Sequence, residues 1–343
     1  MTISVKPPLD PNRYPQGDLF ICDILDAAPK GDMASMEHPV FSLSTKPETR
    51  PKRYENGENW IEIRPGPTGL ATVHDRDVLI FCISNLVAAI NDNREISQLV
   101  RFSAADLIRA TNRPGGGTGY KQLRAAFGRL QGTQIETNIV TGGETVNRIF
   151  SLVDAVEIVR TTETGRMTEV EVKLSDWTFN AIRSKEVLTL SRDYFRLRKP
   201  IERRLYELAR KHCGAQREWR CGLGKLQEKC GSSSTLRLFR QHVRKIAQQD
   251  QEHEYFPDYS LELDKRDIVI FRKRLDQVVD GITIGGLDPE FYHDARQVAP
   301  SWDVYYLETQ WRNWCSHEEI EPKIPGKHFV KFCRTWYEKR GVA

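Results

Sequence analysis

The chain has 343 residues, of which 39% are hydrophobic and 29% charged, the proportions of a soluble globular protein with room for two ordinary domains. No apolar stretch approaches the length that spans a bilayer, and residues 1–18 lack the apolar core of a signal peptide, so we expect a cytoplasmic protein with no membrane partner. The net charge of +4 is modest, and the seven unevenly spaced cysteines favour reduced thiols over disulfides.

The first half of the chain predicts two helices joined by a turn and followed by a β-hairpin. Residues 1–40, rich in Pro, Gly and Asp, are predicted to form an arm, and residues 59–73 a hairpin. Asp75 is the predicted N-cap of a helix over 76–91, and Ser103 of a short helix over 104–111 that follows a strand over 99–103. A helix over 119–131 and two strands around a Gly-Gly turn, 134–140 and 146–153, complete the set.

This order of elements is that of a winged helix, and the second half of the chain repeats it. Residues 167–182 and 187–191 lead into a predicted long helix over 192–212, followed by a short helix over 222–230, a helix over 235–249 and a hairpin over 259–274. We therefore predict an α+β protein with two pseudo-repeated winged-helix domains and a helical C-terminal segment. The predicted boundaries are an arm over 1–40, domains over 41–185 and 186–286, and the segment over 287–343.

The last helix of each predicted pair has an apolar stripe opposite a basic face. The spacing matches three apolar residues in each helix, Leu123, Phe127 and Leu130 with Phe239, Val243 and Ile246. In that alignment Lys121 and Arg124 match Arg237 and Arg240, and Gly128 and Arg129 match Arg244 and Lys245. From Lys229 to Gln249 there are five Lys or Arg and no acidic residue, which suits either a polyanion partner or a solvated helix face. Because packing alone does not require a basic face in both helices, we interpret them as DNA-recognition helices.

The candidate contacts to duplex DNA follow from this interpretation. In the second domain they are base- or phosphate-contacting side chains on the helix and two hydroxyls near its start, namely Arg237, Arg240, Gln241, Arg244, Lys245, Ser233 and Thr235. In the first domain they are Lys121, Gln122, Arg124 and Arg129, with Tyr120 packing against the sugar-phosphate backbone. The hairpin tips near Thr141 and at Lys265 and Arg266 are predicted wings.

Enzymatic and metal-binding alternatives fit the sequence poorly, and we expect no catalytic residue, no cofactor and no metal. In "TNRPGGGTGYKQLR" the lysine is out of register for a phosphate-binding loop and no strand precedes the glycines, which we interpret as an extended turn between two helices. No two histidines are two residues apart, as a rolling-circle nuclease requires, and Tyr194 and Tyr206 lie on apolar helix patterns. The spacing of His212, Cys213, Cys221 and Cys230 is atypical of zinc sites, which favours buried thiols. The C-terminal tryptophans, Trp302, Trp311, Trp314 and Trp336, are predicted to be core residues rather than an exposed partner surface.

Several long strings resemble one known family. The segments "YPQGDLFICDILDAAPKGDMASMEHPVFSLSTKP", "GLATVHDRDVLIFCISNLVAAIN", "VRFSAADLIRATNRPGGGTGYKQLRAAFGRLQGTQI" and, near the end, "ARQVAPSWDVYYLETQWRNW" with "FVKFCRTWYEKRG" resemble the plasmid replication initiator protein A family of α-proteobacteria and relatives. The resemblance covers nearly the whole chain.

The resemblance implies a two-winged-helix initiator that binds DNA repeats, called iterons, at a plasmid origin and helps to open the duplex. It also implies recruitment of host replication proteins such as initiator and helicase, and, from related initiators, autorepression and a homodimeric repressor form. A winged-helix transcriptional repressor without origin function is the alternative, and the C-terminal segment can serve a separate partner.

Overall fold

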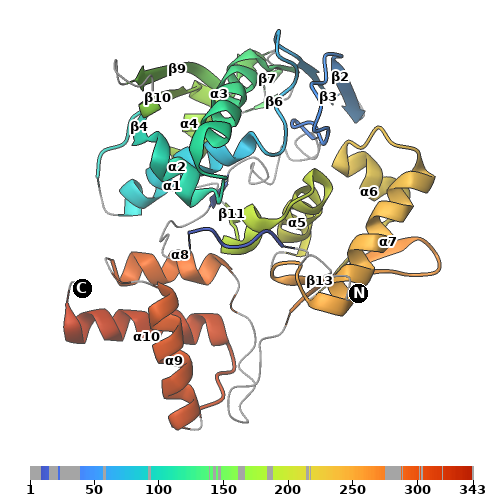
Figure 1. Ribbon diagram of the computed structural model, residues 1–343. Helices are drawn as coiled ribbons and strands as arrows, with labels where there is room; N and C mark the ends of the chain where they lie inside the picture. Colours follow the sequence, from blue (N-terminus) through green and yellow to red (C-terminus); the bar gives the residue numbers. More distant parts are fainter. Residues whose placement is uncertain are drawn as a thin grey trace, which may run out of the picture.

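The computed structural model describes residues 9–14, 22–23, 39–56, 59–91, 94–138, 140–141, 144–145, 148–160, 167–183, 188–213, 216, 218–274, 287, 289–300, 302, 304–318 and 320–341. The fold is a mixture of helices and small antiparallel sheets around three groups of buried side chains (Figure 1). We call these groups the first unit, with its core between Phe41 and Ile182, the second unit, with its core between Leu190 and Phe271, and the third unit, with its core between Leu287 and Cys333.

Among the described residues, the first unit combines four helices with two sheets of three or more strands. The helices are α1 (Arg76–Asn91), α2 (Ala104–Ala110), α3 (Gly116–Gly132) and α4 (Asp176–Arg183). One sheet has the order β2-β3-β5-β8 and the other β4-β10-β9, built from β2 (Lys52–Asn56), β3 (Asn59–Arg64), β4 (Leu99–Ser103), β5 (Gln134–Thr137), β8 (Arg148–Ser151), β9 (Val153–Arg160) and β10 (Met167–Leu174). Ser103 caps α2 as predicted, because its hydroxyl oxygen accepts a hydrogen bond from the Asp106 amide at 3.0 Å.

One strand prediction in this unit is wrong. Within residues 59–73 the only described strand pairing is a single antiparallel bridge between Gly66 and Gly69, and β3 pairs instead with the unpredicted β2 on one side and with β5 on the other. The strand in residues 167–182 is β10, which pairs with β4 and β9 and buries Val170 and Val172 in the first core, on the first-domain side of the predicted boundary at residue 185. Two short pairs complete the strands, β1 (Cys22–Asp23) with β11 (Leu188–Thr189) and β6 (Val140–Thr141) with β7 (Glu144–Thr145).

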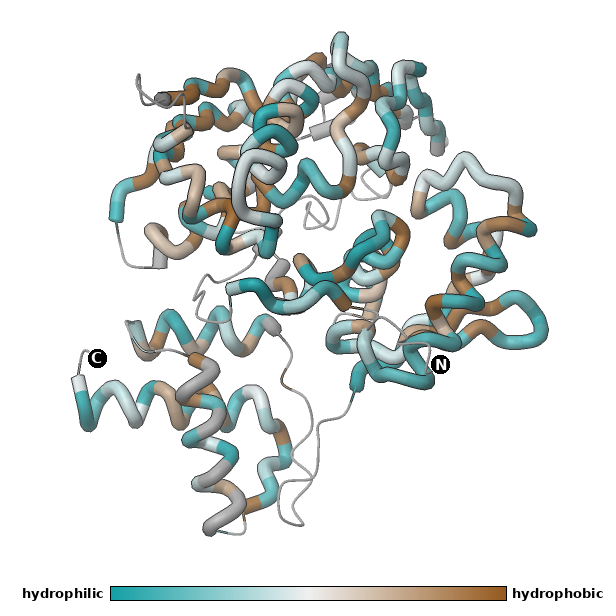
Figure 2. Tube along the Cα trace, in the orientation of Figure 1, coloured by the Kyte–Doolittle hydropathy of each residue, from teal (hydrophilic) through white to brown (hydrophobic). Residues whose placement is uncertain are grey.

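The second unit contains a helix pair followed by a hairpin. Its elements are the 3₁₀ helix η1 (Arg192–Arg196), α5 (Pro200–Cys213), β12 (Glu218–Gly222), α6 (Leu223–Cys230), α7 (Leu236–His253), β13 (Tyr259–Leu263) and β14 (Ile268–Lys273). The sheet order is β12-β14-β13, so the predicted hairpin gains the unpredicted β12 as a third strand. Hydrophilic and hydrophobic residues alternate along α7, as expected of a helix with one buried face (Figure 2). Helix α5 differs, because residues 202–210 are all buried, including the charged ones.

The predicted single helix over 192–212 is wrong, since it is interrupted before Pro200. The chain forms η1, passes through Leu197 in an extended conformation and starts α5 at Pro200. Proline has no amide hydrogen to donate to the preceding turn, and it disfavours the helical conformation of the residue before it. A proline in that position begins a helix instead of continuing one.

The third unit consists of three helices, α8 (Pro289–Val298), α9 (Val304–His317) and α10 (Pro325–Arg340), which form a separate group that includes the C-terminal end (Figure 1). Trp311 is fully buried, as predicted for a core residue, and its indole donates a hydrogen bond to Nδ1 of His328 at 2.9 Å. Trp314 differs from that prediction, because 39% of its surface remains exposed.

Buried ion pairs join the first and second units at the contact between α1 and α5. Arg76 on α1 pairs with Glu207 on α5 at 2.5 Å, and Asp77 pairs with Arg203 at 2.5 Å. All four side chains are nearly inaccessible to water, and Ile80 of α1 packs in the second core. Because such pairs are stable only in a narrow geometry, they define the orientation of one unit relative to the other. Figure 1 shows α5 between the first unit and α7.

The described cysteines other than Cys22 are buried thiols, and burial raises the pKa of Cys230 to about 12. Tyr194 and Tyr206 are completely buried, as predicted. Within the described ranges, no group of three or more His, Cys, Asp or Glu side chains is arranged to hold a metal ion. Among the helices that the structure describes, none is long and apolar enough to cross a membrane.

Candidate nucleic-acid interface

Helix α7 presents the predicted cationic face to solvent. Thr235 caps its start by accepting a hydrogen bond from the Leu238 amide at 3.3 Å, so this hydroxyl has a structural role besides any contact to phosphate. The buried stripe of Phe239, Val243 and Ile246 holds the helix on the second core. The opposite side consists of exposed polar side chains, namely Arg237, Gln241, His242, Arg244, Lys245 and Gln248, and Ser233 is exposed just before the helix.

Arg240 differs from its neighbours because the following hairpin holds it in place. Its Nε and Nη2 donate to the two carboxylate oxygens of Asp267 at 2.8 and 2.6 Å. This bidentate contact raises the pKa of the Arg240 guanidinium and lowers the pKa of the Asp267 carboxyl. The Arg240 side chain is still 30% exposed, so its position beside the helix face is fixed without being buried.

The turn between β13 and β14 places two cations beside this pair. Lys265 and Arg266 are exposed at the turn, where the hairpin was predicted to have its tip. Asp264 stabilises the turn by accepting hydrogen bonds from the amides of Arg266 and Ile268 at 2.7 and 2.8 Å. Asp267 has a φ of 59°, in the left-handed region that Asp tolerates better than most residues. The pair between Arg240 and Asp267 thus links the exposed cations of α7 to those of the turn.

Helix α3 presents a smaller polar face in the first unit. Lys121, Gln122 and Arg124 are exposed, as predicted, while Leu123 and Phe127 are buried. The other two predicted contacts are only partly exposed. Arg129 points inward, where its Nε and Nη2 donate to the Asp75 carboxylate, both at 2.7 Å, and Tyr120 is half-buried against the first core. The Asp75 carboxylate also accepts from Thr72, so Asp75 precedes α1 as predicted but uses its side chain to bind Arg129 and Thr72.

The glycine run is divided between the turn and the helix. The structure starts α3 at Gly116, so the turn is shorter than predicted, and of the three consecutive glycines only Gly116, with φ of 79°, adopts a positive φ. Gly119 is required for a different reason, because a Cβ there would lie 2.0 Å from the Pro114 carbonyl oxygen. Gly117 has no such neighbour and leaves the first turn of α3 bare. The predicted wing tip near Thr141 lies at the end of β6, and its two glycines fall outside the described residues.

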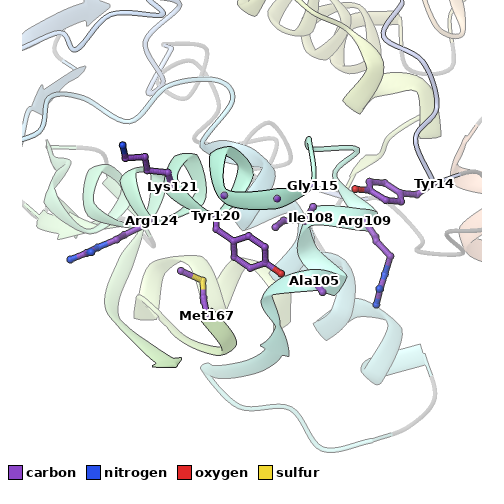
Figure 3. Close-up of a pocket in the computed structure, with 11 residues that line it drawn as sticks. Tyr14, Ala105, Ile108, Arg109, Gly115, Tyr120, Lys121, Arg124 and Met167 are labelled. Atoms are coloured by element: carbon purple, nitrogen blue, oxygen red, sulfur yellow. The ribbon is translucent and has the colours of Figure 1, made fainter. Parts of the chain in front are cut away.

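A cavity of about 730 Å³ opens beside this bare turn. Ile108, Ala105 and Met167 form apolar parts of its lining, and Arg109, Lys121 and Arg124 add cationic groups. Figure 3 shows the Tyr120 ring extending from α3 toward α2 with Met167 beside it. Residues 116–118, which form the first turn of α3, are exposed beside this cavity.

The buried stripes of the two helices have the same spacing but in another register than predicted. The buried residues are Gly119, Leu123, Ala126, Phe127 and Leu130 in α3, and Phe239, Val243, Ile246, Ala247 and Asp250 in α7. This places Leu123 level with Val243, one helical turn from the predicted match with Phe239. Lys121 and Arg124 consequently correspond to Gln241 and Arg244. Gly119 and Asp250 belong to the buried stripes although neither has an apolar side chain, so apolar spacing alone does not reveal this register.

Sequence reasoning missed the two carboxylates that orient arginines at this interface, Asp75 and Asp267. Asp75 is 54 residues from Arg129 and Asp267 is 27 residues from Arg240. No periodicity links such distant positions. The only local signal was that Asp267 follows two cations in a predicted turn.

Comparisons with known proteins agree on one family. Residues 30–261 match the family described as Replication initiator protein A. A protein of Wigglesworthia glossinidia brevipalpis named "Putative replication protein" is 36% identical over 263 residues, which are 75% of this chain and 94% of that protein.

One solved structure shares the fold at low identity. A crystal structure of domains 2 and 3 of RctB matches with a TM-score of 0.51 and 11% identity, covering 69% of this chain and 94% of that one. A second structure of RctB domains 2–3 has a TM-score of 0.49 and 12% identity, covering 68% and 94%. The family match and the 36% identical relative confirm the resemblance seen in the sequence: this chain belongs to the Replication initiator protein A family.

Proposed function

We propose that this protein initiates plasmid replication by binding specific duplex DNA repeats at the origin through two winged helices. In this proposal α3 and α7 enter successive major grooves, and the β13–β14 turn is the wing of the second unit. The proposed partners are iteron repeats and host replication proteins such as the initiator and the helicase, and the proposal includes no catalytic step.

The observation that carries the proposal is the construction of α7 and its hairpin. Arg237, Arg244 and Lys245 are exposed on the face opposite the buried stripe. Arg240 is oriented by Asp267 from the turn that also exposes Lys265 and Arg266. Arginines in a defined orientation can donate two hydrogen bonds to a guanine edge, and the neighbouring cations can neutralise phosphates. Membership of the initiator family supports an origin as the target.

The test measures binding of the full chain to duplexes of the repeats beside its gene, with scrambled duplexes for comparison. If Arg244 contacts a base, Arg244→Ala weakens cognate binding about five- to 150-fold and relaxes preference at one base pair. If it contacts only phosphate, the loss is similar for all duplexes and the slope of log K against log salt falls by about 0.9.

The matched control is Arg101→Ala, which removes an exposed cation from β4, outside α3 and α7. It should leave the affinities for the repeat duplex and for the scrambled duplex unchanged. A folded Arg237→Ala/Arg244→Ala/Lys245→Ala variant that binds every duplex like the parent protein would contradict the proposal.

A transcriptional repressor would use the same surface, so a second experiment must separate it from an initiator. A plasmid that carries only this gene, its flanking repeats and a selectable marker replicates in the host if the protein is an initiator. Failure of that plasmid to replicate, together with tight binding to the repeats, favours the repressor.

A further inference from the structure

The charges of the third unit are segregated along the chain. Between Lys323 and Arg340 there are six Lys or Arg and one acidic residue, whereas residues 288–321 contain eight acidic residues and two Arg. Lys327, Lys331 and Arg334 are four and three residues apart, so they share one face of α10. All three are exposed, and no described carboxylate forms an ion pair with them. One face of α10 is therefore a row of cations available to an anionic partner.

An aromatic stack lies beside this row. Trp314 of α9 stacks on His328 of α10 with ring centroids 5.8 Å apart and an angle of 6° between the planes. The same indole stacks on Phe332 at 5.6 Å and 29°. His328 and Phe332 are one turn apart on α10 and form a row that runs beside the cationic row, next to Lys331 around the helix. Because 39% of the Trp314 surface remains exposed, the stack reaches the protein surface next to the cations.

We propose that α9 and α10 form a binding site for single-stranded DNA. Cations that follow a phosphate backbone, combined with an accessible aromatic ring on which an unpaired base can stack, are the features that recognise single strands without sequence preference. Duplex DNA would use the cations but not Trp314, because its bases are already stacked. The site is separate from α3 and α7, which belong to other units (Figure 1), and so extends beyond the proposed duplex contacts.

The experiment measures the anisotropy of a labelled oligothymidylate about 16 nucleotides long as the full chain is added. Trp314→Leu retains an apolar side chain against His328 and Phe332 but removes the aromatic face, and should weaken binding at least about fivefold. Trp314→Phe should restore most of the affinity. The triple variant Lys327→Gln/Lys331→Gln/Arg334→Gln should reduce the slope of log K against log salt by about 2, since each neutralised phosphate of a single strand contributes about 0.7.

The matched charge control is Lys46→Gln/Arg50→Gln/Lys173→Gln, which removes three cations from the first unit and should leave oligothymidylate binding unchanged. Duplex repeats should bind the Trp314 variants as tightly as the parent chain, so loss of duplex recognition and loss of this site are distinguishable. Equal oligothymidylate binding by the parent chain and both the Trp314→Leu and triple variants overturns the proposal. The proposal is also overturned if oligothymidylate binding is lost only when Arg244 and Lys245 of α7 are replaced, since the single strand would then bind at α7.

Discussion

The buried pair between Asp77 and Arg203 makes a quantitative prediction about how the first two units are held together. Arg203 donates to Asp77 at 2.5 Å and to the carbonyl oxygens of Leu197 and Phe195 at 2.9 and 3.1 Å. Burial raises the pKa of the Asp77 carboxyl even though Arg203 and Arg113 lie close to it. Arg203→Met would leave that carboxyl with Arg113 alone, 3.6 Å away, and would leave two carbonyls without their donor.

Breaking a buried ion pair by removing one partner costs about 3–5 kcal/mol, a large part of the roughly 5–15 kcal/mol that stabilises an ordinary domain. We therefore expect Arg203→Met to lower the urea midpoint strongly when unfolding is followed by circular dichroism. Asp77→Leu/Arg203→Met should recover part of the loss, since it removes the unpaired carboxylate but leaves Arg113 without its ion pair to Asp77.

Arg101→Met, at an ion pair whose arginine is 72% exposed, is the control and should not shift the midpoint. A loss below about 1 kcal/mol in Arg203→Met, or a double variant as unstable as the single one, would refute the assignment of this pair as the joint between the units.

Three further predictions concern the DNA-facing surface and pH. Arg240→Ala should weaken binding to the cognate duplex about five- to 150-fold. Asp267→Asn keeps Arg240 but no longer fixes its orientation, so in a selection from randomised sites it should broaden the base preference more than it lowers the affinity. An unchanged base preference would show that Asp267 does not position Arg240. Gly119→Ala should destabilise the first unit in thermal melts, because its Cβ would meet the Pro114 carbonyl oxygen. Gly117→Ala, which has no such neighbour, should stabilise α3 by about 0.5–1 kcal/mol. If the DNA sugar-phosphate backbone approaches this turn, Gly117→Ala should also weaken DNA binding in titrations. Desolvation, with Arg203 and Arg113 nearby, holds the pKa of His74 well below its ordinary value of about 6.5, so on acidification the unfolded state takes up the proton first. The contribution of His74 to the free energy of unfolding is therefore present above about pH 6.5 and falls below it, by at most about 1.4 kcal/mol per pH unit. His74→Gln should flatten that pH dependence in urea titrations at several pH values.

Features that depend on neighbouring residues were predictable. Ser103 before α2 and the apolar spacing of α7 indicated their helices because a cap and a buried stripe involve residues only a few positions apart. The hairpin turn containing Lys265 and Arg266 was predictable for the same reason. Pro200 also carried a local signal, because its missing amide hydrogen marks the first turn of a helix, and α5 begins there.

The sequence by itself determined the two helix pairs, the hairpin after α7, the cationic face of α7 and the family. Only the tertiary structure decided which cations remain free to meet DNA, because their partners are distant in the chain. Asp75 takes Arg129 out of the exposed face, and Asp267 orients Arg240. The joint between α1 and α5, and the sheet that receives β10, were equally beyond prediction, since side chains far apart in sequence meet only when the cores pack.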